Sequence, residues 1–357
     1  MTTAPWMVYG ANGYTGELIV DEAVRRGLRP VLAGRSAEKL QPIAKRHGLE
    51  VRAFGLEDPA AVARGFAGMG AVLHCAGPFF QTSWAVVDGC LAARAHYLDI
   101  TGEIPVFEIC ARRDAEAKEA GIVVLPGTGF DVVPSDCLAA SLKAALPTAT
   151  SLELAFGGGA GLSRGTAKTM VAGLGMGGAV RRGGKIVRVP LAYAVKTIPF
   201  RDQPRVAVTI PWGDIATAWR STRIPDITVY VVAPPAQLRQ MKISRWLGPL
   251  LRKEWVQRIL TNRIERTMTG PSAKRRDAAQ MQLWGRVADD AGAAVEGTLV
   301  TPEGYSLTAT TAVECVVRLL AGGVTPGYQT PSLAFGAGFV TTFAGCDLRI
   351  GSVTRTA

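Results

Sequence analysis

Histidine and paired cysteine are both scarce in this sequence. Its 357 residues include three histidines, His47, His74 and His96, and six cysteines, none of which forms a CxxC pair. Neither set has the spacing of metal ligands, so the sequence predicts no metal site. Most of the cysteines lie in apolar runs, which favours buried, reduced thiols over disulfides.

Long uncharged apolar runs are also missing. None approaches the roughly 18 residues needed to span a bilayer. The best candidate, Leu333 to Gly345, is shorter and predicts a buried helix. The first strand is expected within about five residues of the start, and no secretory signal pattern precedes it. We therefore expect a cytoplasmic protein, with peripheral membrane contact left open.

Basic residues, by contrast, are in excess. The formal net charge is +11, and residues 239–276 alone hold eleven Lys or Arg against Glu254 and Glu265. Apolar residues recur in this segment at near-helical spacing. Three interpretations follow: an amphipathic helix with a solvated basic face, a surface for an anionic membrane, or a surface for an acidic carrier protein. No recognition motif for nucleic acid accompanies the charge, so nucleic acid is not an expected partner.

The N-terminal third of the sequence alternates between apolar segments and helical patterns. Six segments predict strands: WMVYG, RPVLAG, EVRAFG, GAVLHCAG, HYLDI and GIVVLPG. Near-continuous apolar strands that alternate with helices indicate a parallel sheet covered on both faces. We predict an α/β fold, a doubly wound Rossmann sheet, over residues 1–133.

The pattern changes after Pro134. Five segments predict strands without regular helices between them: TSLELAF, RVAVTI, DITVYVVA, MQLWGRVAD and AAVEGTLVT. They indicate a second, α+β domain over residues 134–304, with longer helices near residues 163–178 and 237–268 and a role in substrate binding or dimerisation. Residues 305–357 return to a helical pattern, and we expect them to pack back on the Rossmann domain. A homodimer remains open.

Three glycines follow the first strand in YGANGYTG. Gly10, Gly13 and Gly16 precede a predicted helix, the context of a dinucleotide-binding turn. Such a turn needs glycine for its tightness, for the approach of a pyrophosphate and for close packing of helix on strand. The phosphates would lie at the positive end of the new helix.

The end of the second strand indicates which dinucleotide binds. An NAD-binding domain usually has an acidic residue there, whereas this chain has LAGRSAEKL, with Arg35 and no acid. A guanidinium matches the 2′-phosphate of NADP(H). Ser36 and Lys39 could contact the same phosphate, although a solvated arginine and a helix cap are the alternatives. The predicted cofactor is NADP(H), and the predicted cofactor-binding residues are Gly10, Asn12, Gly13, Tyr14, Thr15, Gly16, Arg35, Ser36, Lys39, Ala76, Gly77 and Pro78.

These segments together resemble the saccharopine dehydrogenase-like NADP-binding oxidoreductases. The resemblance rests on YGANGYTG, LAGRS, CAGPF, YLDITGE and GTGFDVVPSD, and covers almost the whole chain. The later segments SRGT, GPSAKRR, YSLTA and GYQTPSLAFG are most similar to the trans-acting enoyl reductase branch. That branch often has a second glycine where this chain has Arg164. The resemblance implies a pyridine-nucleotide oxidoreductase with a Rossmann domain, a smaller α/β domain and a C-terminal helix.

Acidic residues follow the fifth and sixth predicted strands, where the groups that act on substrate should lie. Asp131 and Glu103 are the catalytic candidates, as substrate-binding or proton-transfer groups. A helix-capping or loop-bracing role is at least as good an interpretation of each acid, Asp99 included. Cys75 and Cys137 lie near the same edge, and we expect structural thiols there. The substrate candidates are Thr101, Gly102, Phe130, Ser163 and Thr166.

The sequence thus predicts an NADPH-dependent reductase that acts on a small-molecule or acyl substrate. The favoured group is an enoyl C=C bond of an acyl or lipid-like molecule. A saccharopine-like reductive amination and a non-catalytic NADP(H)-binding redox sensor are the alternatives. A short-chain dehydrogenase is disfavoured, because none of the seven tyrosines has a lysine four residues later.

Overall fold

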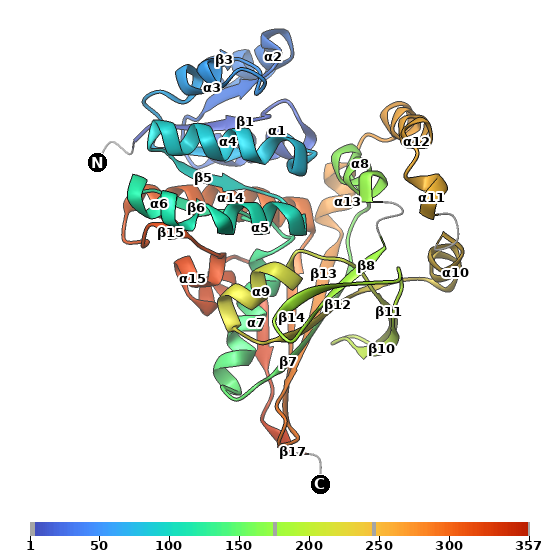
Figure 1. Ribbon diagram of the computed structural model, residues 1–357. Coiled ribbons are helices and arrows are strands. Elements are labelled where there is room, and N and C mark those ends of the chain that lie inside the picture. The colour runs from blue at the N-terminus through green and yellow to red at the C-terminus, as the bar shows by residue number, and fades with distance from the viewer. Residues whose placement is uncertain (1–3, 174–176, 245–247, 356–357) are drawn as a thin grey trace. The chain divides into compact units, whose positions relative to one another are not determined.

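The chain forms two compact units in a computed structural model that describes residues 4–173, 177–244 and 248–355 (Figure 1). The first unit is Met1–Val133 with Tyr305–Phe335, and the second is Pro134–Gly304 with Gly336–Ala357. The limits at 133 and 304 coincide with the domain limits expected from the sequence. Residues 336–357 do not follow the expectation that the whole tail belongs to the first domain, because two of their segments pair with the sheet of the second unit.

The first unit contains a parallel sheet in the order β15-β6-β5-β4-β1-β2-β3. Its strands are β1 (Trp6–Tyr9), β2 (Val31–Gly34), β3 (Val51–Ala53), β4 (Ala71–His74), β5 (His96–Asp99), β6 (Val123–Leu125) and β15 (Gly327–Tyr328). The six predicted strands are all present, and the order of β1 to β6 is that of a doubly wound dinucleotide-binding sheet, which confirms the predicted fold. The strand β15 was not predicted; it is so short that it has no pattern of its own.

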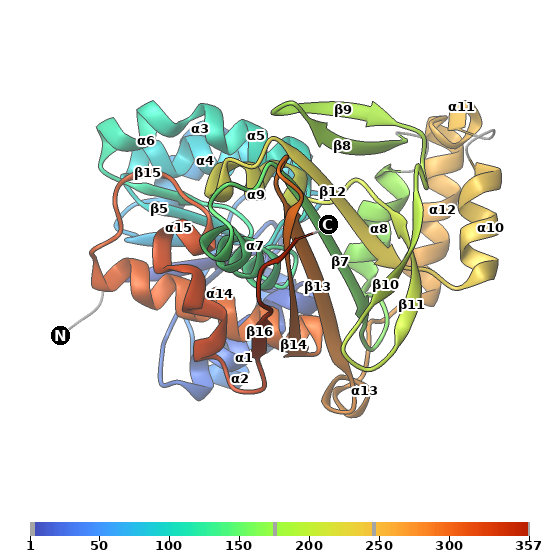
Figure 2. The same cartoon turned by 90° about the horizontal axis from the view of Figure 1, so that it is seen from below.

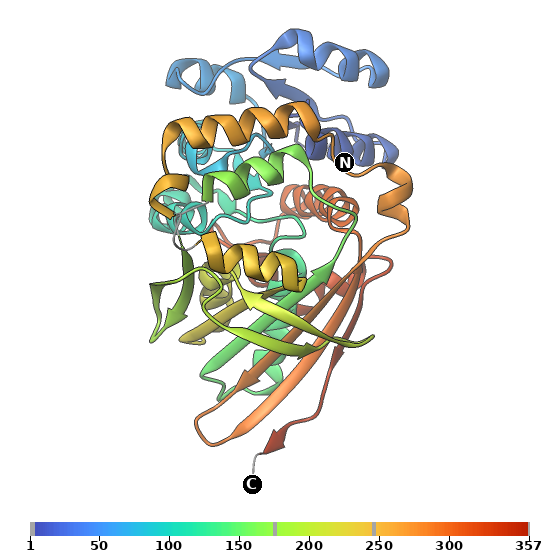
Figure 3. The same ribbon diagram turned by 90° about the vertical axis from the view of Figure 1, so that its right-hand side faces the viewer.

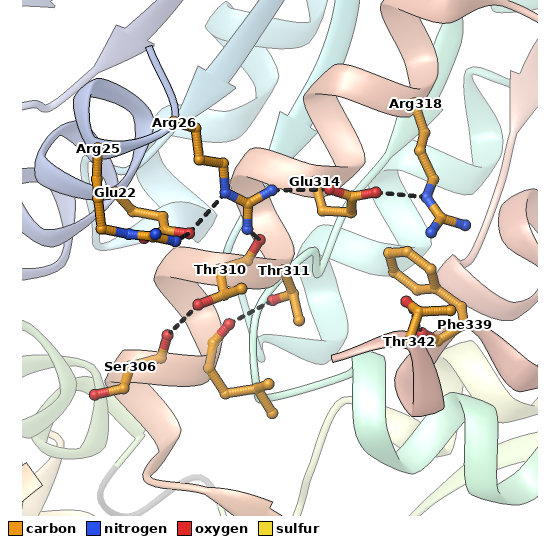
Figure 4. Close-up of polar contacts among 11 residues, drawn as sticks. Glu22, Arg25, Arg26, Ser306, Thr310, Thr311, Glu314, Arg318, Phe339 and Thr342 are labelled. Atoms are coloured by element: carbon orange, nitrogen blue, oxygen red, sulfur yellow. Dashed lines mark hydrogen bonds and ion pairs between the residues drawn. The ribbon is translucent and has the colours of Figure 1, made fainter. Parts of the chain in front are cut away.

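Helices cover both faces of this sheet. They are α1 (Tyr14–Arg25), α2 (Ala37–His47), α3 (Pro59–Phe66), α4 (Phe79–Ala93), α5 (Ile104–Arg112), α6 (Asp114–Ala120), α14 (Gly304–Ala321) and α15 (Pro331–Phe335). On one face, side chains of α3, α4, α5 and α6 form a core with alternate residues of the strands, such as Met7, Val72 and Tyr97. The helices α1 and α14 are joined by an ion pair between Arg26 and Glu314, 2.8 Å long (Figure 4).

The second unit contains a mixed sheet, in which β10-β11-β12-β7-β13-β14-β16 are neighbours (Figure 2). Its strands are β7 (Ser151–Gly158), β8 (Gly178–Arg182), β9 (Lys185–Val189), β10 (Val195–Pro199), β11 (Pro204–Thr209), β12 (Asp226–Val232), β13 (Gln280–Ala288), β14 (Ala293–Pro302), β16 (Asp347–Ile350) and β17 (Thr354–Arg355). The pair β7 and β12 is parallel, and the other pairs are antiparallel. The five strands predicted for this domain are present, as expected for an α+β arrangement.

Helix α7 (Val133–Ala145) packs on this sheet where two glycines leave room. A side chain at Gly285 or Gly297 would meet Leu138, and one at Gly285 would also meet Leu142. The remaining helices are α8 (Arg164–Gly173), α9 (Asp214–Thr222), α10 (Pro235–Ser244), α11 (Gly248–Leu251), α12 (Glu254–Thr267), α13 (Ala273–Asp277) and the 3₁₀ helix η1 (Ala337–Thr342).

Three helix predictions for this half of the chain are wrong in extent. The helix expected over 163–178 ends at Gly173, and β8 already starts at Gly178; residues 174–176 lie outside the described part. The helix expected over 237–268 is not continuous among the described residues, because Arg252 and Lys253 separate α11 from α12; residues 245–247, between α10 and α11, lie outside the described part. The buried helix expected over 333–345 is interrupted at Gly336, whose φ of +87° is unsuited to a helix.

Candidate cofactor and active site

Five loops of the first unit leave its sheet at the carboxyl ends of parallel strands. They follow β1, β2, β4, β5 and β6, and so gather along one edge of the sheet. The loop after β1 contacts the loop after β4, because a Cβ placed on Gly10 would lie 2.7 Å from the backbone nitrogen of Ala76. All but two of the predicted cofactor, catalytic and substrate residues lie at this edge or just beyond it, in the first turn of the next helix.

The glycine turn has the geometry of a phosphate cradle. Gly10 has a φ of +88°, which disfavours other residues, and a Cβ on Gly16 would collide with the carbonyl oxygen of Gly10. Gly13 is the N-cap of α1 and has no side chain to cap the amides of the first turn. Those amides and the positive helix end suit the pyrophosphate of a dinucleotide.

The other residues of this turn surround the same helix start. Asn12 is exposed, with its Oδ1 near Gly34 at the end of β2, and Thr15 is partly buried. Tyr14 contacts Tyr305 of α14 edge to face, with ring centroids 5.1 Å apart. Tyr305 thus lies beside the glycine turn, although the sequence indicates it only as part of a motif and not as a site residue.

Arg35 is exposed directly after β2, where the 2′-phosphate of NADP(H) is expected. Burial raises the pKa of Tyr9 to about 12. The charge of Glu57 adds to this rise, and the charge of Arg35 opposes it. Arg35 therefore lies near the carboxyl end of β1. Ser36 caps α2 by accepting a hydrogen bond from the amide of Lys39, and the Lys39 side chain is exposed.

The loop after β4 is held by the helix that follows it. The Thr82 hydroxyl donates to the carbonyl oxygens of Ala76 and Pro78, at 2.8 and 3.1 Å. Gly77, which is exposed, is joined to Pro78 by a cis peptide bond. These contacts fix the backbone that the cofactor would pass, and Cys75, at the start of the loop, has a thiol pKa raised by burial.

Asp99, at the end of β5, is buried and holds together the loop after β5 and the loop after β6. Its carboxylate accepts hydrogen bonds from the Tyr97 hydroxyl at 2.6 Å and from the amides of Thr101 and Gly127. Its carbonyl oxygen accepts two more from Thr128. Burial raises the pKa of Asp99 to about 6, against the lowering effect of these donors. The contacts support the loop-bracing interpretation of this acid.

Glu103 lies in the same loop and caps a helix. Its two carboxylate oxygens accept hydrogen bonds from the amides of Phe79 and Phe80, at 3.0 and 2.9 Å. These amides belong to the first turn of α4, so Glu103 satisfies two of its free donors. Burial raises the pKa of Glu103, and the two amides oppose the rise. Thr101 is fully buried, and its hydroxyl accepts from the amide of Glu103.

Asp131 follows β6 and packs on the same loop. A Cβ placed on Gly102 would lie 2.8 Å from its Oδ2, so glycine at 102 allows the carboxyl group to reach this backbone. Burial, with the nearby charge of Glu103, raises the pKa of Asp131 to about 7. A carboxyl group with this pKa is partly protonated at neutral pH and can transfer a proton.

Helix α14 supports the loop that carries Asp131. The amide of Phe130 donates to the Thr308 hydroxyl at 2.9 Å, and the Thr311 hydroxyl donates to the carbonyl oxygen of Thr128 at 2.8 Å. Phe130 is buried. Sequence reasoning missed both threonines, because they lie far from the loop along the chain; the only signal was the motif YSLTA, which contains Thr308.

Two substrate candidates belong to the second unit. Ser163 accepts a hydrogen bond from the amide of Thr166, and their hydroxyls are 3.0 Å apart at the start of α8. The Arg164 side chain donates to the carbonyl oxygen of Met268. In this unit the three residues organise the start of α8, and the role of Ser163 and Thr166 in substrate binding stays a prediction.

The first unit matches the saccharopine dehydrogenase NADP binding domain over residues 6–125. The glycine cradle and the exposed Arg35 fit this cofactor, and the first unit is similar to such NADP binding domains over these residues.

Known proteins extend the comparison. A human saccharopine dehydrogenase-like oxidoreductase is 27% identical over 150 residues, and a Caenorhabditis elegans lipid droplet localized protein is 31% identical over 144. Each match covers 36% of this chain and 35% or 34% of the relative, so it spans about a third of either protein. The chain is similar to saccharopine dehydrogenase-like oxidoreductases in this part.

The similarity in fold extends further. The structure of saccharopine dehydrogenase (L-Glu forming) from Saccharomyces cerevisiae aligns with a TM-score of 0.64 and 13% identity, over 98% of this chain and 100% of the yeast chain. At this identity the match establishes the two-domain fold. Among the described helices, none has both the length and the apolar character required to cross a membrane.

Proposed function

We propose that the protein is an NADPH-dependent reductase that reduces an enoyl C=C bond of an acyl or lipid-like substrate. The observation that carries the proposal is the character of the loops after β5 and β6. Asp99, Glu103 and Asp131 are their charged residues, and neither 99–103 nor 127–131 contains Lys or Arg. Acidic loops disfavour the carboxylate-rich substrates of a saccharopine-like reductive amination.

The proton requirement points in the same direction. Bound NADPH would supply a hydride to one carbon of the double bond, and a proton must then reach the neighbouring carbon. Asp131, with a pKa of about 7, can supply that proton. Asp99 and Glu103 hold the loops around it, and the Glu103 charge helps to keep Asp131 protonated. A protonated imine needs no such donor during hydride transfer.

The comparisons support this choice of substrate indirectly. One relative is named for its localisation to lipid droplets, which fits a lipid-like substrate. The motifs SRGT, GPSAKRR and GYQTPSLAFG resemble those of enoyl reductases. Together with the loop chemistry, these similarities favour an apolar acyl chain with a conjugated double bond.

A substrate panel tests the proposal. Purified protein would be mixed with NADPH and, separately, with enoyl thioesters, 2-oxo acids plus amines, and aldehydes, while the absorbance of reduced nicotinamide is followed. We expect oxidation with an enoyl thioester and a saturated product by mass spectrometry, with a much lower rate for Asp131→Asn. The exposed Glu119→Gln provides a control that should retain the rate.

Two outcomes would contradict the proposal. Turnover only with 2-oxo acids and amines would establish the reductive amination. Tight NADPH binding without turnover of any substrate, carrier-bound thioesters included, would favour the redox sensor.

A further inference from the structure

Helices α10, α11 and α12 of the second unit expose large apolar side chains. Ile243, Leu250, Trp255 and Ile259 have exposed fractions of 55, 46, 58 and 58%. Single exposed apolar residues are ordinary on a protein surface. Four of them occur here on three helices that are consecutive in the chain, and two of the four, Trp255 and Ile259, belong to one helix, α12.

Helix α12 has an inner and an outer face. Val256, Leu260 and Ile264 are partly buried on the inner face, and α12 lies along α8 (Figure 3). An ion pair of 2.5 Å between Lys168 of α8 and Glu265 also joins the two helices. The helix is thus already anchored to its own unit by its inner face.

The outer face of α12 combines apolar and basic residues. Trp255 and Ile259 are four residues apart, which places them one above the other on a helix. Arg258, Arg263 and Arg266 are exposed around them. Within the part of the chain that the structure describes, the side chains of these three arginines make no ion pair, so their charges face solvent.

This arrangement has the chemistry of a membrane interface. Tryptophan favours the boundary between headgroups and acyl chains. Arginine side chains extend along apolar surface and place their charge at headgroup phosphates. Arg252 and Lys253 add two exposed positive charges between α11 and α12.

We propose that α10, α11 and α12 bind the surface of an anionic lipid bilayer, with Trp255 and Ile259 inserted at the headgroup boundary and the arginines paired with lipid phosphates. An acidic carrier protein would also attract the arginines. On α12, however, Trp255 and Ile259 stand among the arginines on one helix face, and this combination matches the boundary between acyl chains and anionic headgroups better than a purely acidic surface. The surface is independent of the reaction assigned to the first unit.

Vesicle sedimentation of the full chain tests this surface. Vesicles of phosphatidylcholine alone are compared with vesicles that contain about a third phosphatidylglycerol. We expect binding to the anionic vesicles only, and its loss when the salt rises from about 0.1 M to about 0.5 M. Thermal melts and NADP⁺ binding of each variant report whether it is folded.

Matched variants locate the contact. Trp255→Ser should weaken binding by about tenfold, whereas Trp84→Ser, at a similarly exposed tryptophan of α4, should leave it unchanged. Arg258→Ala with Arg263→Ala should weaken binding by roughly 30-fold. Lys185→Ala with Arg188→Ala removes the same charge from β9 and should have little effect.

Two results would overturn the proposal. The first is no binding of the folded protein to anionic vesicles; a carrier complex or a dimer that Trp255→Ser abolishes, measured by light scattering, would then assign the surface to a protein partner. The second is an equal loss of binding in the two charge variants, which would reduce the effect to net charge.

Discussion

Arg35 is an exposed cation at the place where the cofactors NADP(H) and NAD(H) differ. It follows β2, and Ser36 after it is committed to capping α2. A charged hydrogen bond to the 2′-phosphate contributes about 1.5–3 kcal/mol. We expect Arg35→Ala to raise the Kd of NADP⁺ by roughly 10–100-fold and to leave the Kd of NAD⁺ nearly unchanged, as measured by calorimetry.

Arg46→Ala is the matched control for this change. Arg46 is an exposed arginine of α2 that lies 3.9 Å from the carboxylate of Asp21. Its loss should affect neither dinucleotide. If Arg35→Ala weakens both dinucleotides equally, Arg35 does not select the phosphate.

Asp131 is expected to make turnover depend on pH. Its pKa of about 7 means that the protonated donor is lost as the pH rises through neutrality. The rate should therefore fall above about pH 7. In Asp131→Asn we expect a low rate without this limb, measured from kcat across the pH range. A variant that keeps both the rate and the limb would assign the proton to another group.

The same carboxyl group should affect stability with a defined sign. An aspartate in an unfolded chain has a pKa of about 4, so between about pH 4 and pH 7 the folded chain binds more protons at this site. Its contribution to stability is therefore lost as the pH rises through this window. Asp131→Asn should melt higher than the natural chain at about pH 8, and the difference should shrink towards about pH 4.

At the scale of elements, α4 depends on a carboxylate from a neighbouring loop. Glu103→Ala removes the acceptor of the Phe79 and Phe80 amides and should lower the free energy of unfolding by about 1–2 kcal/mol. Glu103→Gln keeps one acceptor oxygen and should lose less. Urea denaturation measures both, with Glu119→Gln as an exposed control. Full stability combined with lost turnover in Glu103→Ala would favour the catalytic role predicted for this residue over the capping role.

Helix α14 provides a second test at this scale. Thr308→Val leaves the buried amide of Phe130 without its acceptor and should destabilise the chain by about 1–3 kcal/mol. Thr310→Val is the neighbouring control, because the Thr310 hydroxyl donates to the Ser306 carbonyl oxygen within α14, and Arg26 contacts the Thr310 carbonyl oxygen rather than the side chain (Figure 4). Equal unfolding midpoints for the two variants in urea would contradict a supporting role for Thr308.

The elements also indicate what the sequence could predict. The strands β1 to β6 were predictable because they are apolar along most of their length. The positions of the glycine turn and of Arg35 were also predictable, because each directly follows one of these strands. The capping contact of Glu103 was not predictable. The Phe79 and Phe80 amides that it caps belong to α4, which precedes Glu103 by a whole strand and loop. The pKa of Asp131 depends on burial, which no local pattern encodes. The strands β15 and β17 are too short to carry any periodicity.

At the scale of the whole molecule, the chain passes between the units more than once. It leaves the first unit after Val133, returns at Tyr305 and enters the second again at Gly336. The C-terminal segment from Tyr305 onwards thus serves both units. Helix α14 buries Leu307, Val313, Val316 and Leu319 in the first unit.

Removal of this segment should therefore destabilise both units and not only the C-terminal residues themselves. A chain that ends at Gly304 loses α14 and β15 from the first unit, and loses β16, which pairs with β14, from the second. Each fully buried leucine or valine stabilises the fold by about 1.5–3 kcal/mol, so α14 alone contributes as much as a typical domain has in total. We expect no cooperative thermal transition and no NADP⁺ binding, whereas a chain that ends at Gly351 lacks, among the described elements, only β17 and should retain both. A shortened chain that still melts cooperatively and binds NADP⁺ would show that the segment Met1–Val133 folds without α14.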